Sequence, residues 1–191
     1  MSNQIINSTS QNFLIDVFKA LNFAAIKHRH QKRKGVSGIP YINHPIGVTS
    51  LLIQKINEPS KEIIISSILH DVIEDTNTSP EELKLQFGGN IMNLVMEVSD
   101  DMTLSYSQRK NIQIIKANTL SYEARCIKIA DKTCNIRDIL ATRIYWSRKQ
   151  KIRYIEWAIQ VISRIRDTHK GLVEEFDITI GNAEEILKYK F

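Results

Sequence analysis

Apolar residues recur along most of this chain at spacings of three and four, which places them on one face of a helix. The first such series runs from Phe13 through Val17 and Leu21 to Ala25. No segment alternates convincingly between apolar and polar residues, as a half-buried strand would. The pattern therefore predicts an all-α fold, a bundle of helices.

Local signals predict where the first helices begin and end. The basic stretch at residues 29–34 is expected to end the first helix, and Gly35 to Pro40 should form a loop. Pro45 suits the first position of the next helix, which would make His44 its cap residue. The isoleucine-rich segment from Ile63 to Glu74 resembles a buried strand, but its length and acidic end favour one buried helix.

Further boundaries follow from cap residues. Residues 79–82, Ser-Pro-Glu-Glu, form a strong helix start, and Gly88-Gly89 should end that helix. One long helix is expected from Ser121 through Ala141, and another from about Ser147 to Phe176. Asn182, followed by Glu185, is expected to cap a last short helix.

Length and composition predict one globular unit. The chain has 191 residues, of which 42% are hydrophobic and 25% charged, so it can bury a proper core. We expect a single domain over residues 1–191, with a core at about 10–165 and a C-terminal helical extension at about 166–191. Four prolines and seven glycines fit a helical protein better than a loop-rich one.

Charge and cysteine content narrow the expected partners. The net charge of +5 is modest and spread along the chain, which favours attraction of phosphates and argues poorly for a nucleic-acid surface. No apolar run is long enough to span a bilayer, so no membrane partner is expected. Cys126 and Cys134 have no CxxC spacing, and no secretory signal opens the sequence. These features predict a cytoplasmic protein.

A polar cluster interrupts the isoleucine-rich segment. On a helix, His70, Asp71, Glu74 and Asp75 would span an arc of roughly 140°, opposite the apolar residues. Three close carboxylates repel one another unless a cation or a proton compensates, and a metal ion is the simplest compensation. The alternative is a solvated acidic helix end, which the helix macrodipole disfavours. His-Asp alone would still favour that structural alternative.

Two further positions could complete a site. Lys128, Asp131, Asn135 and Asp138 share roughly 80° of one helix face, which could also be plain surface. His44 could equally be a helix cap or a packed core residue. Taken together, two imidazoles and two carboxylates suit Mn²⁺, Fe²⁺ or Zn²⁺ and leave coordination positions for water and a phosphate oxygen.

The order His, His-Asp, Asp resembles the HD phosphohydrolase superfamily. The flanking residues are similar to the hydrolase domain of the RelA/SpoT family over roughly residues 13–160. The length of the chain leaves no room for a synthetase domain, so the resemblance is to the small alarmone hydrolases, including the animal SpoT homologues. The segments that carry the resemblance are Arg33-Lys34, residues 40–45 (PYINHP), residues 70–76 (HDVIEDT), Phe87-Gly88, Arg109-Lys110, residues 128–132 (KIADK) with Asn135, and Trp146-Ser147 with Tyr154, Trp157 and Ala158.

The resemblance implies an HD-domain helical bundle and a specific reaction. Family members use Mn²⁺ to hydrolyse guanosine 3′,5′-bis(diphosphate), ppGpp, or its 5′-triphosphate form, pppGpp, to GDP or GTP and pyrophosphate, which ends the stringent-response signal. It implies one metal ion per site. The implied metal ligands are His44, His70, Asp71 and Asp131. The implied catalytic pair is Glu74 and Asp75, and the sequence leaves open which of them is acid and which is base.

The resemblance also implies substrate contacts. Arg33 would stack on guanine and Lys34 would contact phosphate, although a basic helix end is a competing explanation. Asn135 would contact the nucleoside, and Tyr41 would line the pocket or be a buried structural tyrosine. The remaining contacts are Arg109 and Lys110, either at the second diphosphate or on a solvated face.

Two departures and two other functions stay open. Met102 stands where relatives often carry lysine, and Cys134 replaces an aromatic residue or histidine; both could alter the pocket but neither touches the metal set. One alternative is a phosphatase for NADPH or another nucleotide with the same metal site. The other, a silent nucleotide sensor, ranks last because it predicts damage among the catalytic residues.

Overall fold

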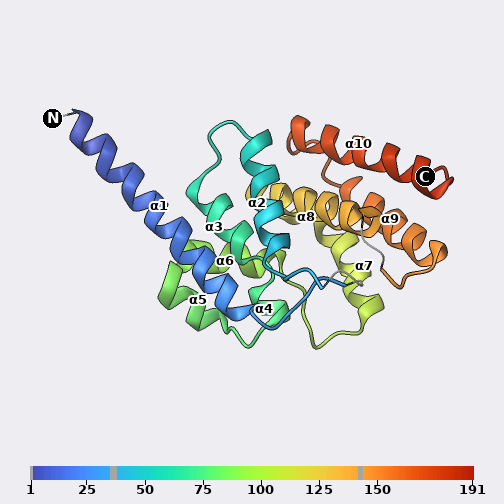
Figure 1. Cartoon of the computed structure of the whole chain (residues 1–191), viewed down its shortest axis with the longest axis horizontal. Coiled ribbons are helices and arrows are strands. Elements are labelled where there is room, and N and C mark those ends of the chain that lie inside the picture. Colours follow the sequence, from blue (N-terminus) through green and yellow to red (C-terminus); the bar gives the residue numbers. More distant parts are fainter. Residues whose placement is uncertain (1, 35–37, 142–143) are drawn as a thin grey trace.

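The computed structural model describes residues 2–34, 38–141 and 144–191, which form helices joined by short connections (Figure 1). Within these residues the only extended pairing is an isolated antiparallel bridge between Lys32 and Pro40. The all-α prediction is confirmed. The helices are α1 (Ser2–Lys27), α2 (Asn43–Lys55), α3 (Lys61–Leu69), α4 (Val72–Asp75), α5 (Pro80–Phe87), α6 (Gly89–Val98), α7 (Tyr106–Lys116), the 3₁₀ turn η1 (Ala117–Thr119), α8 (Tyr122–Ala141), α9 (Arg148–Ile162) and α10 (Lys170–Leu187).

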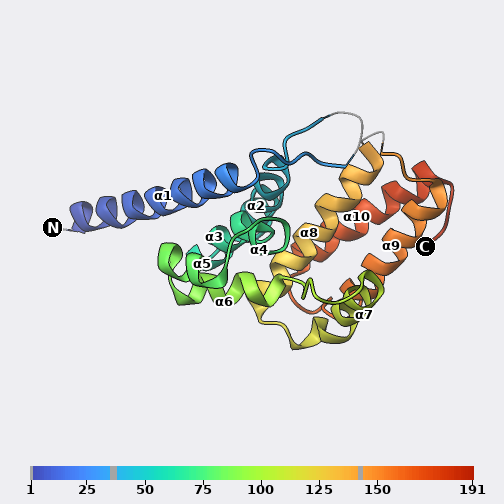
Figure 2. The ribbon, with the colours of Figure 1, turned by 90° about the horizontal axis from the view of Figure 1, so that it is seen from below.

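Helix α8 lies at the centre of the bundle and contacts α2, α3, α6, α9 and α10. Figures 1 and 2 show α1 reaching away from the other helices toward the N-terminus, while α8, α9 and α10 form the opposite end of the molecule. None of the described helices is both long and apolar enough to cross a membrane.

The apolar faces form two hydrophobic clusters. The first joins α2, α8, α9 and α10 and includes Ile129, Ile155 and Phe176. The second joins α1, α3, α5 and α6 and includes Leu69 and Leu83. Helices α2 and α3 contact each other, as do α3 and α8, so the two clusters meet along these helices.

Several predicted boundaries are confirmed by cap hydrogen bonds. Ser79 Oγ accepts from the N–H of Glu82, with Pro80 in the first turn of α5. Gly88 ends that helix with φ of 88°, a left-handed value that favours glycine. Ser121 Oγ accepts from the N–H of Ala124 at the start of α8.

The predicted starts and ends near the site are partly wrong. The first helix ends at Lys27, so the basic stretch at 29–34 follows the helix instead of ending it. His44 is not a cap but the second residue of α2, because the N–H of Asn43 and that of His44 are already bound by the carbonyls of Pro40 and Tyr41. Residues 35–37 of the predicted loop lie outside the described residues.

The segment from Ile63 to Glu74 is not one helix, which corrects the prediction. Helix α3 ends at Leu69, His70 and Asp71 form a turn, and α4 follows. The His70 Nδ1–H donates to the carbonyl of Ser67 at 2.8 Å. That carbonyl is the acceptor which the N–H of Asp71 would use in a continuous helix. The side chain thus competes with the backbone and ends α3.

The predicted helix from Ser147 to Phe176 is also wrong. Ser147 does cap α9 in a capping box with Gln150, but this helix ends at Ile162. Short turns follow, in which the N–H of Ile165 bonds to the carbonyl of Ile162, and His169 caps α10. Asn182 therefore lies inside α10 and caps no helix. Periodicity missed this reversal because both helices turn an apolar face toward α8.

The division into a core at about 10–165 and an extension at about 166–191 stays a prediction, and a substitution in α10 tests it. Phe176 is 2% exposed within the first cluster, whereas Ile178 on the same helix is 58% exposed. If α10 completes the core, Phe176→Ala should lower the free energy of unfolding by about 3–5 kcal/mol, and the control Ile178→Ala by no more than about 0.5 kcal/mol. Urea denaturation followed by circular dichroism measures both; an unchanged midpoint for Phe176→Ala would show a separate appendage.

Candidate metal centre and active site

The turn between α3 and α4 presents His70 to the interior. Because the carbonyl of Ser67 can only accept, the ring proton of a neutral His70 lies on Nδ1. Its Nε2 then carries a free lone pair, and this atom is buried with no hydrogen-bond partner among the described residues. A buried orphan nitrogen of this kind is what a metal ligand presents before it is bound.

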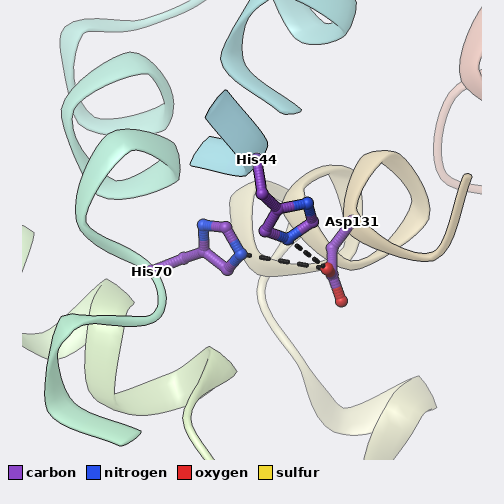
Figure 3. Close-up of side chains that lie close together, drawn as sticks. All are labelled: His44, His70 and Asp131. Atoms are coloured by element: carbon purple, nitrogen blue, oxygen red, sulfur yellow. Dashed lines mark hydrogen bonds and ion pairs between the residues drawn. The ribbon is translucent and has the colours of Figure 1, made fainter. Parts of the chain in front are cut away.

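His44 and Asp131 face this nitrogen from two other helices (Figure 3). His44 extends from the first turn of α2, and its Nε2 lies 3.1 Å from Oδ1 of Asp131 on α8. His70 Nε2 lies 3.8 Å from the same oxygen. One ligand atom from each of the three side chains lies within 4.8 Å of the others, and all three residues are buried.

Asp71, the fourth predicted ligand, reaches the same point. Its Oδ2 lies 3.6 Å from His44 Nε2 and 3.2 Å from His70 Nε2. The same oxygen accepts a hydrogen bond from the hydroxyl of Tyr41 at 2.7 Å. The fold therefore brings together all four side chains that the sequence predicts as ligands.

The donor set fits a divalent cation. Burial opposes charge at His70, but the carboxylates of Asp71 and Asp131 outweigh it and raise the pKa of the imidazole to about 10. Burial likewise opposes ionisation of these two carboxyls, yet His70 beside Asp71 and Lys132 beside Asp131 hold the pKa of each well below its ordinary value. The cluster is built to concentrate negative charge beside imidazole nitrogens, which is the chemistry of a divalent metal site.

Two neighbours on α8 orient Asp131. Lys132 Nζ donates to its Oδ2 and Asn135 Nδ2 to its Oδ1, both at 2.6 Å. Lys132 is 4% exposed and lies 4.9 Å from the ring centroid of Trp157. Lys132 had no predicted role, although its position directly after Asp131 on an apolar helix was a usable signal.

The predicted catalytic pair lies on α4, next to the candidate ligands. Glu74 and Asp75 line a cavity of about 150 Å³ together with His44, His70, Asp71 and Asp131. One oxygen of Glu74 accepts from the backbone N–H of Asp100 at 2.7 Å. Burial raises the pKa of Glu74 to about 7, with Lys128 opposing the rise.

Asp100 was missed from the sequence. Gln113 on α7 donates to both of its carboxylate oxygens, at 2.7 and 2.8 Å. Asp100 stands 26 residues from Glu74 and has no periodic relation to it, so only the tertiary fold reveals that it fixes the Glu74 carboxylate.

A larger cavity of about 430 Å³ opens beside the small one. It holds four of the predicted substrate contacts, Arg33, Lys34, Tyr41 and Asn135, and adds the rings of Trp146 and Tyr154, which were noted in the sequence without a role. The two cavities share Tyr41, Asp75, Asn135 and Tyr154 in their linings, so they lie directly beside each other.

Arg33 is fixed by polar contacts at the wall of this pocket. Its Nε donates to Asp138 at 2.9 Å, and its terminal nitrogen donates to Asn135 Oδ1 at 2.6 Å. Its Cζ lies 5.3 Å from the ring centroid of Tyr41. The alternative of a basic helix end does not apply to Arg33, since α1 ends six residues earlier at Lys27.

Lys110 and Arg109, the last two predicted substrate contacts, lie at different places. Lys110 lines the small cavity, with its Nζ 3.2 Å from the ring centroid of Trp157. Arg109 lines neither cavity and donates to the carbonyl of Leu104, with its Nε 3.7 Å from the carboxylate of Asp100. Met102 and Cys134, the two departures from the family pattern, line neither cavity.

Comparison with known proteins agrees with this geometry. The family model described as "HD domain" matches residues 20–155. The chain belongs to the HD-domain family. Within that family it is similar to two proteins named guanosine-3′,5′-bis(diphosphate) 3′-pyrophosphohydrolase MESH1. The Homo sapiens protein is 41% identical over 83% of this chain and 89% of its own length, and the Xenopus tropicalis protein is 40% identical over 84% and 90%.

A solved structure shares the arrangement of this HD-domain chain. It is described as a metazoan orthologue of SpoT that hydrolyses ppGpp and plays a role in starvation responses. The TM-score is 0.84 at 34% identity, over 87% of this chain and 94% of that one. The predicted HD-domain bundle and the predicted resemblance to small alarmone hydrolases are both confirmed.

Replacing the orphan histidine tests the metal centre. After dialysis against a chelator, the unsubstituted protein should bind about one Mn²⁺, because its ligand atoms are already gathered. We expect His70→Ala to weaken binding more than about 100-fold, beyond the 10- to 100-fold typical of outer-shell changes. Isothermal titration calorimetry with MnCl₂ measures this. The matched control is His30→Ala at an exposed histidine; equal affinity in His70→Ala and the control would refute the site.

Proposed function

We propose that this chain is a metal-dependent phosphohydrolase that removes the 3′-diphosphate of ppGpp, releasing GDP and pyrophosphate. The observation that carries the proposal is the buried cluster of His44, His70 and Asp131, which adjoins Glu74 and Asp75 at the end of a pocket lined by basic and aromatic side chains. The names of the similar proteins support this substrate.

His44, His70, Asp71 and Asp131 would hold one divalent ion, which we take to be Mn²⁺ from the family resemblance. When bound, such an ion supplies Lewis acidity toward a phosphate oxygen and lowers the pKa of water. Tyr41 donates to Asp71, while Lys132 and Asn135 donate to Asp131. These bonds fix the carboxylate orientations, so the ligands need little rearrangement when an ion binds.

Glu74 and Asp75 handle the protons of the reaction. Water adds to the phosphorus attached to the ribose 3′-oxygen, the P–O3′ bond breaks, and the 3′-oxygen must gain a proton. One carboxyl accepts the proton of the attacking water and the other supplies one to the leaving oxygen. A pKa near 7 suits Glu74 to either task, and its bond from Asp100 leaves its second oxygen for proton transfer.

The larger cavity would receive the nucleoside. Arg33, Lys34, Tyr41 and Asn135 border it, and its volume of about 430 Å³ fits a ligand of nucleotide size. Lys110 would pair with phosphate at the small cavity. Arg109 has its donors turned to Leu104 and Asp100, so we assign it a supporting role instead of a direct contact with the second diphosphate.

The competing functions have less support. A silent sensor would tolerate damage among the catalytic residues, whereas Glu74 and Asp75 both border the metal cluster. The names of the similar proteins favour ppGpp over NADPH as the substrate.

The direct test is incubation of ppGpp with the purified protein, with and without Mn²⁺. We expect stoichiometric GDP and pyrophosphate with the ion and no turnover after chelation. Anion-exchange chromatography separates the products, and NADPH serves as the comparison substrate. Release of phosphate from NADPH without cleavage of ppGpp would overturn the proposed substrate while retaining the metal site.

Glu74→Gln tests the catalytic pair. The amide keeps the acceptor for the Asp100 N–H but cannot exchange a proton, so kcat should fall by about 10²- to 10⁴-fold with KM little changed. The matched control is Glu81→Gln, at an exposed glutamate of α5, which should leave both constants unchanged. Retention of kcat in Glu74→Gln would remove this residue from proton transfer.

The pH dependence of KM tests Lys110. Burial and the nearby Lys132 lower the pKa of its ammonium to about 7, so its positive charge is present below pH 7 and is lost as the pH rises. The KM for ppGpp should therefore increase above pH 7. Lys110→Arg keeps the positive charge above pH 7 as well as below it, so KM should rise less with pH in this variant. Identical pH profiles of KM in the two proteins would contradict a role for Lys110 in binding phosphate.

A further inference from the structure

His28 follows the last residue of α1, and its side chain lies in the interior although it lines neither of the two cavities. The residue is 2% exposed, and its N–H bonds to the carbonyl of Ala24 as a continuation of α1. Neither the proposed metal site nor the proposed substrate pocket explains why a histidine is buried here.

The hydrogen bonds around His28 fix its tautomer. The carbonyl of Asp75 can only accept, so the group of Gln31 that contacts it is the amide nitrogen. The amide oxygen of Gln31 then faces His28 Nδ1 at 2.6 Å and must accept from it. His28 therefore carries its proton on Nδ1, and this donor sets the orientation of the Gln31 amide.

That amide holds the end of α4. Helix α4 has only four residues, and the carbonyls of a last helical turn have no partner within the helix. Gln31 supplies a donor to the carbonyl of Asp75, adjacent to Glu74. The position of both proposed proton-transfer groups thus depends on a bond from outside α4.

His28 also supports the other end of the same segment. Its ring stacks on Tyr41, with the ring centroids 4.8 Å apart and the planes 25° from parallel. The hydroxyl of Tyr41 donates to Asp71 Oδ2 at 2.7 Å. One buried ring therefore contacts the two side chains, Tyr41 and Gln31, that hold the segment from Asp71 to Asp75 at its two ends.

We propose that His28 is a positioning residue with two separable actions. Its Nδ1–H fixes the position of α4 through Gln31. Its ring fixes the position of Asp71 through Tyr41. The inference rests on the proposed function only for its effect on turnover, because its effect on metal affinity requires no substrate.

Two substitutions separate these actions. His28→Phe keeps a ring against Tyr41 and removes the donor to Gln31. It should lower kcat for ppGpp by about 10- to 100-fold, with Mn²⁺ affinity within about twofold of the unsubstituted protein. His28→Asn keeps an N–H donor and removes the ring. It should weaken Mn²⁺ binding by about 10-fold or more and restore most of kcat at saturating Mn²⁺. His30→Asn, at an exposed histidine, is the control.

Three measurements make the test decisive. Calorimetric titration with MnCl₂ alone gives the affinity for Mn²⁺, and steady-state kinetics at saturating Mn²⁺ gives kcat and KM. Amide hydrogen exchange of a peptide covering residues 71–78 reports how strongly α4 is held in its folded position. Amide exchange in that peptide should accelerate in His28→Phe. Equal changes in both variants, or no change in either, would overturn the inference, since a purely structural histidine would not divide the two effects.

A single substitution of Gln31 guards against loss of folding in His28→Phe. Gln31→Leu removes the hydrogen bond from the Gln31 amide to the carbonyl of Asp75 without altering a core residue. It should lower kcat to a similar extent as His28→Phe. The double variant His28→Phe/Gln31→Leu should have a kcat no lower than that of the slower single variant, because both substitutions break the same series of contacts from His28 to Asp75. Additive losses would overturn the inference. If the unsubstituted protein binds Mn²⁺ but does not cleave ppGpp, the proposed function fails, while the affinity and exchange results still decide the role of His28.

Discussion

The whole site depends on burying the carboxylates of Asp71 and Asp131 next to two imidazoles. Carboxylates removed from water are tolerated only when opposite charge and hydrogen bonds replace their hydration. Lys132, Asn135 and Tyr41 provide part of that replacement, and the remainder comes from a proton or a cation among the ring nitrogens. Lys132 and Asn135 lie on α8 with Asp131, and Tyr41 directly precedes α2, so the replacement comes from residues next to the ligands themselves.

The four side chains that the sequence suggested as ligands lie together in the structure, whereas two of the helices near them were predicted with the wrong bounds. Polar residues on apolar helices indicated these positions, and the resemblance to the RelA/SpoT family implied their roles as ligands and as a catalytic pair. Those roles stay predictions. The break at His70 did not follow, because a side-chain bond to the Ser67 carbonyl competes with helical periodicity. The reversal between α9 and α10 was missed for a different reason: both helices have apolar faces, so the hydrophobic pattern continues across the turn.

Supporting residues were the hardest to predict. Asp100 reaches Glu74 through its backbone N–H, a group that every residue except proline possesses, so its identity gave no signal. His28 and Gln31 precede the motifs and act through contacts with Tyr41 and Asp75 that exist only in the folded chain. Arg109 shows the converse, because a charged residue beside Lys110 turns away from the cavity.

The candidate ligands also come from both hydrophobic clusters. His70 and Asp71 lie between Leu69 and Val72 of the second cluster, and Asp131 follows Ala130 of the first. His44 and Asp131 are separated by 87 positions in the chain. An ion held here would bind only the folded arrangement of these distant ligands, so its binding free energy would add to the stability of the fold. Metal supply would then govern the lifetime of the folded protein as well as its chemistry.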